Sequence, residues 1–112
     1  MLTTRSRGES LDSNKKDKIL SLLGLAQRAG RITSGEDLVV ESIQKKQAKL
    51  VFLANDAAAN LQKKITDKSK TYQVEVNTTF STLEISAALG KARKVLAVTD
   101  AGFTKKMRSI ME

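Results

Sequence analysis

Apolar residues at helical spacing define the first element of the chain. Between Ile19 and Ala26 they recur three or four positions apart, which is the spacing of one face of an α-helix. A polar cap at Ser13 or Asn14 precedes this stretch and Gly30 follows it, so the pattern predicts a helix between these points. One face of this helix is expected to pack against the rest of the fold.

A second helix is predicted to begin at Ser34. Ser34 and Asp37 have the spacing at which each side chain can accept a hydrogen bond from a free backbone N–H of the first helical turn. Leu38, Val39 and Ile43 then recur on one side, and we expect them to form the buried face of this helix.

Two continuous apolar runs are typical of strands that are buried on both faces. They are KLVFLAN, residues 49–55, and KVLAVT, residues 94–99, and each is bounded by charged or turn-forming residues. Apolar and polar residues alternate over residues 72–76, which predicts a third strand with one exposed face.

Three further helices complete the pattern. One is predicted to begin at Asp56 and to end near the polar stretch 67–70. Ser81 and Glu84 have the spacing of a capping box, which predicts another helix start, and the last helix is expected over residues 102–111.

Helices that alternate with strands predict an α/β fold. We expect a three-layer α/β/α sandwich with a small mixed sheet, because the helices must cover both faces of the buried strands.

A chain of 112 residues is too short for two ordinary domains. Residues 1–12 are polar and aperiodic and are interpreted as a flexible tail, and residues 13–112 as a single domain.

The charge of the chain indicates a polyanionic partner. Twenty Lys and Arg residues against twelve Asp and Glu give a formal net charge of +8, and the charges of the first twelve residues cancel. Such an excess in a small domain favours phosphate backbones, so nucleic acid is the expected partner. The alternative is that a lysine-rich surface only keeps the protein in solution.

The residue types that are missing argue against an enzyme. The chain has no Cys and no His, which excludes disulfides, thiolate metal sites and a histidine general base. We therefore expect a non-enzymatic protein without cofactor or metal. The absence of Cys suits the cytoplasm, and no apolar run is long enough to cross a membrane.

Asp56 and Asp100 are the two carboxylates placed where an enzyme could use them. Each follows a predicted buried strand and precedes a predicted helix, a position suited to catalysis or to capping of the helix. Capping is the favoured interpretation for both.

The segments at residues 30–60 and 82–100 carry a family resemblance. The chain resembles, over about residues 14–111, the ribosomal proteins that recognise kink-turn RNA, the group of the archaeal large-subunit protein seven-Ae and the eukaryotic protein thirty-e. LLGLAQRAGRITSGED, residues 22–37, and AVTDAGFTKKM, residues 97–107, look most like the small bacterial YlxQ-type members. The resemblance implies a monomeric, ribosome-associated RNA-binding protein whose partner is structured RNA, ribosomal RNA in particular, and not a membrane or a small-molecule substrate.

The resemblance also implies where RNA would bind. The two places are the start of the second helix and the loop before the last buried strand, with Arg28 and Arg31 beside the first and Asn55 on the same side. The candidate RNA-binding residues are Arg28, Arg31, Ser34, Gly35, Glu36, Asp37, Leu38, Asn55, Lys91, Ala92, Arg93 and Lys94.

The helix-start motif departs from the one that kink-turn binders share. The family pattern has either an Asn-Glu pair or a Gln that addresses the bases, followed by a lysine that addresses the backbone, whereas residues 35–41 of this chain read GEDLVVE. Leu38 has no polar group for a base edge, and Glu41 puts negative charge in the place of the lysine. We therefore expect a bent or bulged RNA to be recognised mainly through phosphate contacts and shape.

Two other functions stay open at the level of sequence. The first is a protein-interaction module on the same scaffold, with the RNA surface lost, which exposure of Leu38 would favour. The second is an RNA-modifying enzyme that uses Asp56 or Asp100.

Overall fold

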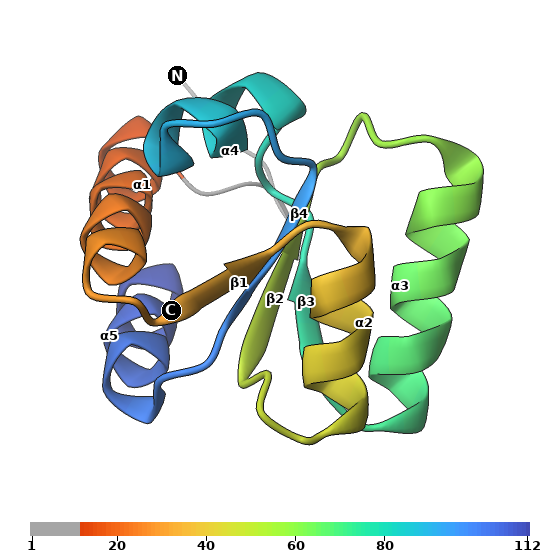
Figure 1. The fold of residues 1–112 in the computed structure, drawn as a ribbon. Helices are drawn as coiled ribbons and strands as arrows, with labels where there is room; N and C mark the ends of the chain where they lie inside the picture. The colour runs from red at the N-terminus through yellow and green to blue at the C-terminus, as the bar shows by residue number, and fades with distance from the viewer. Residues whose placement is uncertain (1–11) are drawn as a thin grey trace.

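Five helices and four strands alternate along residues 12–112, the part of the chain that the computed structural model describes (Figure 1). The helices are α1 (Ser13–Arg28), α2 (Glu36–Gln44), α3 (Ala59–Thr71), α4 (Thr82–Leu89) and α5 (Ala101–Met111). The strands are β1 (Ile32–Ser34), β2 (Leu50–Leu53), β3 (Glu75–Asn77) and β4 (Val95–Val98).

The strands form one mixed sheet in the order β1-β4-β2-β3. Strand β4 is antiparallel to both of its neighbours, whereas β2 and β3 are parallel. Helices α1, α4 and α5 lie on one side of the sheet and α2 and α3 on the other (Figure 1). The predicted three-layer α/β/α sandwich with a small mixed sheet is confirmed.

The two central strands supply the middle of the core. Every residue of β2 and β4 is buried, as their continuous apolar sequences predict, while the edge strands β1 and β3 are only partly covered. Phe52 of β2 packs against Phe80, with ring centroids 6.0 Å apart. None of the helices within residues 12–112 is long and apolar enough to cross a bilayer.

Side chains cap all three helices of the layer that holds α1, α4 and α5. Asp12 accepts a hydrogen bond of 2.9 Å from the backbone N–H of Lys15, so the cap of α1 lies one residue before the predicted Ser13 or Asn14. The capping box of Ser81 and Glu84 at α4 is confirmed, and the Ser81 N–H holds the pKa of Glu84 below its usual value. Apart from Asp12, the predicted tail lies outside the described residues.

The start of α2 differs from the prediction. Ser34 does not cap the helix, because it ends the short strand β1, which the sequence analysis missed. Gly35 occupies the N-cap position, with φ 96° and ψ 151° and without a side-chain cap. Only glycine adopts this backbone region readily, so Gly35 makes the sharp turn from strand to helix possible.

The predicted buried face of α2 is partly wrong. Val39 and Ile43 are completely buried, but 57% of Leu38 is exposed. The buried Ser42 takes the place on the inner side of the helix that a third apolar residue was expected to fill. Leu38 is therefore a surface residue close to the turn at Gly35.

The backbone at Gly35 leads to a stability prediction. We expect Gly35→Ala to lower the free energy of unfolding by about 1–3 kcal/mol, because a Cβ is strained at this φ and ψ even though space is available. Gly90→Ala is the matched control. Gly90 has φ 76° and ψ 17°, an αL conformation in which alanine costs only about 1 kcal/mol. Urea unfolding of both variants measures the difference, and equal losses would contradict the special role of Gly35.

Candidate nucleic-acid interface

The start of α2 and the loop before β4 lie against each other. The backbone N–H of Gly35 donates a 3.0 Å hydrogen bond to the carbonyl of Val95. The Nε of Arg93 donates another 3.0 Å bond to the hydroxyl of Ser34. The two places that the sequence analysis selected therefore form one continuous surface.

The loop itself is held by a serine of α4. The Ser86 hydroxyl accepts a 3.0 Å hydrogen bond from the N–H of Arg93 and donates a 3.1 Å bond to the carbonyl of the same residue. The Nη1 of Arg93 also donates to the carbonyl of Ala92, at 2.8 Å. Both the backbone and the guanidinium of Arg93 are thus fixed in place. We call residues 34–37 and 90–95 together the turn–loop surface.

An open hollow of about 350 Å³ lies on this surface. Its lining consists of Gly35, Glu36, Leu61, Thr82, Ala92, Arg93, Lys94 and Val95. Leu61 and Thr82 come from α3 and α4 and were not among the predicted residues. No local sequence signal points to them, because only the packing of these helices brings them beside the loop.

Asp56 stabilises the edge of this hollow in an unexpected way. It was predicted to cap the helix that follows it, but α3 begins only at Ala59. Its carboxylate instead accepts hydrogen bonds from the hydroxyl of Thr82, at 2.7 Å, and from the Thr82 N–H, at 2.9 Å. These bonds hold the pKa of Asp56 below its usual value, and the bond from the Thr82 hydroxyl has the largest effect. The nearby charge of Lys94 also lowers this pKa.

The other predicted contacts divide between the two ends of the sheet. Asn55 lies at the turn–loop end, since the adjacent Ala54 N–H bonds to the carbonyl of Lys94, and its side-chain amide donates to Thr79 at 3.2 Å. Arg31 does not flank Gly35. It lies at the opposite end of β1, where its carbonyl accepts from the N–H and hydroxyl of Thr99.

Arg28 and Asp100 also lie away from the turn at Gly35. Arg28 is exposed at the end of α1, in the other helical layer, and its guanidinium folds back toward Gly24. Asp100 caps α5 by accepting a 2.8 Å hydrogen bond from the N–H of Phe103, which confirms the predicted capping role.

Neighbouring lysines pair with Glu36 and Glu41 of GEDLVVE, whereas Asp37 forms no ion pair within residues 12–112. Lys64 of α3 is 2.7 Å from Glu36, which raises the pKa of Lys64, and Lys45 is 2.8 Å from Glu41, which lowers the pKa of Glu41. All four side chains of these pairs remain about half exposed. The pairs reduce the repulsion that these carboxylates would exert on a phosphate.

The charge and chemistry of the surface suit a polyanion. Lys91 and Lys94 form no ion pair within residues 12–112, and both side chains are exposed. In that part of the chain no cluster of three or more acidic side chains is placed to hold a metal ion. The fold and this site define a small α/β/α domain with a basic, preorganised surface at one end of its sheet.

Comparison with known proteins assigns the chain to a family. A model of the ribosomal protein L7Ae/L30e/S12e/Gadd45 family matches residues 17–108, and the chain belongs to this family. It is 42% identical over 102 residues to the RNA-binding protein YlxQ of Enterococcus faecium, an alignment that covers 91% of this chain and 99% of that protein. The predicted resemblance to this ribosomal protein family and to its YlxQ-type members is thereby confirmed.

Two further relatives are similar in sequence or in structure. The chain is 47% identical over 92 residues to the RNA-binding protein YlxQ of Bacillus subtilis, covering 81% of this chain and 92% of that one. The solved structure of a protein with unknown function from Bacillus halodurans matches with a TM-score of 0.79 and 41% identity, covering 84% of this chain and 96% of that chain.

The hydrogen bonds to Asp56 predict a pH-dependent stability. Because its pKa is lowered in the folded state, Asp56 stabilises the fold above its unfolded-state pKa of about 3.9, and this contribution is lost as pH falls through the lower, folded-state value. We expect Asp56→Asn to destabilise the protein at neutral pH, and the difference from the native chain to vanish in strong acid. Urea unfolding at a series of pH values measures this difference.

Thr82→Val provides the matched control, since it removes the hydroxyl but keeps the backbone N–H. It should move the pKa of Asp56 part of the way back to its usual value, as followed by the carboxyl carbon in an NMR titration. An unchanged pKa of Asp56 in this variant would mean that the hydroxyl bond does not act as described.

Proposed function

We propose that this chain is a non-enzymatic RNA-binding protein that recognises a bent or bulged structured RNA with its turn–loop surface. The observation that carries the proposal is the fixed position of Arg93 against Ser34, which joins the start of α2 and the basic loop into one surface. The relatives in Enterococcus faecium and Bacillus subtilis are themselves named RNA-binding proteins. Membership of the ribosomal protein family agrees with the same function.

The geometry suits two phosphate strands that meet at a bend. Lys91 and Lys94 extend from the loop on one side, and the backbone N–H groups at the start of α2 have no side-chain cap on the other. Free N–H groups and the positive end of a helix dipole attract phosphate oxygens. The hollow between them has apolar walls from Leu61 and Val95, which can receive an unstacked base.

Recognition in this proposal depends more on shape than on base edges. Leu38 has no hydrogen-bonding side chain at the position where family members address bases, and more than half of it is exposed. Phosphate contacts position a protein on RNA without reading its sequence. We therefore propose that the bend or bulge, and not a particular base pair, is the main determinant.

The proposed biological setting follows from the family and the composition. The proposed partner is structured RNA, and ribosomal RNA is the first candidate. The protein would bind it as a monomer, in the cytoplasm and in association with the ribosome. The high net charge and the absence of Cys support this setting. No small-molecule substrate or cofactor takes part in the proposed function.

Exposure of Leu38 favours a second candidate, a protein-interaction module on the same scaffold. With 57% of its surface exposed beside the turn, Leu38 offers an apolar anchor that a partner protein could cover. In that case the basic loop would not be needed for binding of the partner protein. The two candidates therefore differ in which residues they require.

The test is loss of charge on the loop. We expect the triple variant Lys91→Gln, Arg93→Gln and Lys94→Gln to bind a bulged RNA hairpin at least about tenfold more weakly, with a salt slope lower by about 2–3, because up to three phosphate contacts are lost. Fluorescence anisotropy at several salt concentrations measures both quantities. The control triple is Lys18→Gln, Lys63→Gln and Lys106→Gln, which removes the same charge from exposed sites elsewhere.

Two outcomes would contradict the proposal. One is a native affinity that does not change with salt, and the other is an equal loss of binding in both triple variants. If instead Leu38→Asp disrupts a protein complex while the loop variant leaves it intact, the interaction module is the better account.

A further inference from the structure

The positive charge of the chain extends well beyond the turn–loop surface. That surface contains three of the twenty Lys and Arg residues, Lys91, Arg93 and Lys94. A second group of cations lies at the opposite end of β4, around the loop that leads into β2 and along α5. We call this group the far surface, and it consists of Arg31, Lys46, Lys49, Lys105 and Arg108.

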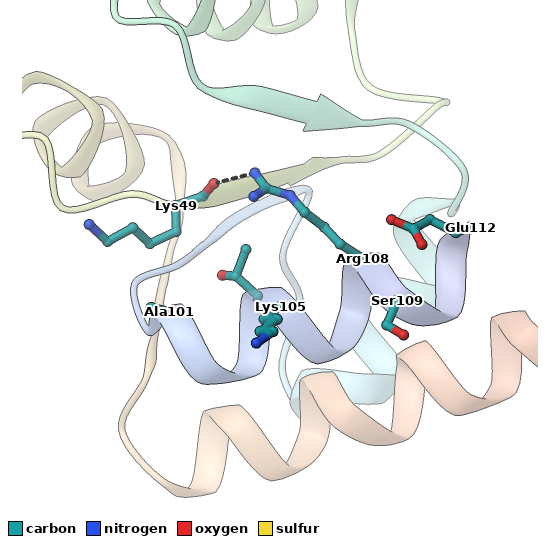
Figure 2. A pocket seen from close by; sticks show the side chains of 7 residues that line it. Lys49, Ala101, Lys105, Arg108, Ser109 and Glu112 are labelled. Carbon is teal, nitrogen blue, oxygen red and sulfur yellow. Dashed lines mark hydrogen bonds between the residues drawn. The ribbon is translucent and has the colours of Figure 1, made fainter.

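Two open hollows meet at Lys49 in the far surface. One, of about 490 Å³, lies along α5, and Figure 2 shows Lys49, Lys105 and Arg108 around it. The other has a volume of about 470 Å³, and its lining consists of Thr33, Lys46, Gln47, Lys49 and Thr99. The two hollows adjoin at Lys49, and cations line both of them.

Most of these cations are available to a ligand. Lys46, Lys49 and Lys105 form no ion pair with a carboxylate within residues 12–112. Arg108 is 3.0 Å from Glu75, but both side chains are about half exposed, so that pair holds the guanidinium only weakly. Within residues 12–112 the side-chain carboxylates at this end are Glu75, Glu112 and Asp100, which is 3.9 Å from the exposed Arg31. Five cations against three carboxylates leave the far surface positive.

The backbone beneath these side chains is well supported. The Lys49 N–H donates a 2.8 Å hydrogen bond to the carbonyl of Val98, and the Lys49 carbonyl accepts from the Nη2 of Arg108 at 3.3 Å (Figure 2). The N–H of Lys46 bonds to Ile43 at 3.0 Å, which closes the turn after α2. The cations are therefore presented from a fixed scaffold, which lowers the entropy lost on binding.

The far surface and the turn–loop surface are too far apart to contact the same phosphate group. Val95 and Val98, the two ends of β4, are separated by roughly 10 Å at the usual rise of a strand. Val95 borders the hollow of the turn–loop surface, and the cations of the far surface lie beyond Val98. The chain thus presents positive charge at both ends of its sheet.

We propose that the far surface binds the phosphate backbone of a second RNA segment, so that the protein bridges two RNA segments. The bridging role rests on the proposed function, which supplies the first segment. A small anion would need donors that converge on one point, whereas these cations are spread along two adjoining open hollows, as suits a polyanionic strand. Contacts of this kind hold RNA without reading its sequence.

The experiment measures capture of one RNA by another through the protein. A bulged RNA hairpin is immobilised and saturated with the native chain, and retention of a labelled plain RNA duplex is then recorded. We expect the duplex to be retained. The variant Lys46→Gln, Lys49→Gln and Lys105→Gln should bind the hairpin within about twofold of the native chain but retain at least about tenfold less duplex.

The control is the triple Lys18→Gln, Lys63→Gln and Lys106→Gln, which should retain the duplex like the native chain. Lys106 is next to Lys105 in sequence but lines the groove between α1 and α5, so it is a close match. No retention by the native chain, or equal retention by the far-surface variant, would overturn the bridging proposal. Retention of a polyglutamate peptide in preference to the duplex would replace RNA by an acidic protein as the partner.

Binding of the hairpin alone distinguishes failure of the proposed function from failure of the bridging proposal. If the native chain does not bind the hairpin at all, the turn–loop proposal fails and the far surface is tested alone, with the plain duplex in solution. Salt-dependent binding that the far-surface variant loses would then support an RNA contact there. Absence of such binding would overturn it.

Discussion

Strand β4 hydrogen-bonds to a partner strand on each side, and the position of every functional residue follows from these two ladders. Its pairing with β1 sets Ser34 opposite Leu96, which brings the turn at Gly35 beside the loop that precedes β4. Its pairing with β2 sets Leu53 opposite Val95 and brings Asn55 to the same end. Both faces of β4 are buried, so a shift of either ladder by one residue would exchange the side chains that pack against the two helical layers; core packing therefore fixes the register and, with it, the site.

Elements with a strong internal pattern were predictable from sequence. The apolar runs of β2 and β4, the amphipathic α1 and the capping box of α4 each carry their signal within a few residues, and all are present in the structure. Strand β1 was missed because it is only three residues long and half buried, and because Ser34 and Asp37 imitate a capping box. The glycine between them determines the turn instead.

The errors at the site have two physical causes, which are contacts between residues distant in sequence and the extended strand β1. Asp56 looked like the cap of the next helix, but its partner is Thr82, which folding alone brings near. Arg31 is close to Gly35 in sequence, yet an extended strand carries the two to opposite ends of the sheet. The juxtaposition of Gly35 and Arg93 could be predicted only through the family resemblance, since neither segment encodes the position of the other.

The positive charge of the chain is spread over two surfaces and is not confined to one. Glu36 at the start of α2 pairs with Lys64, and Glu41 further along the helix pairs with Lys45, which reduces the opposition of these two carboxylates to the loop cations. The cations at the other end of β4 add a second region of positive potential. A protein of this kind gains affinity from many phosphate contacts and specificity from the rigid shape that holds them.

The most direct measurement of the central claim is an NMR titration of the native chain with a bulged RNA hairpin, followed at the backbone amides. Because the turn and the loop form one surface, we predict that the amides of residues 35–37 and 91–95 shift together and give a single dissociation constant. Shifts confined to one of the two segments, or two different constants for them, would contradict the account.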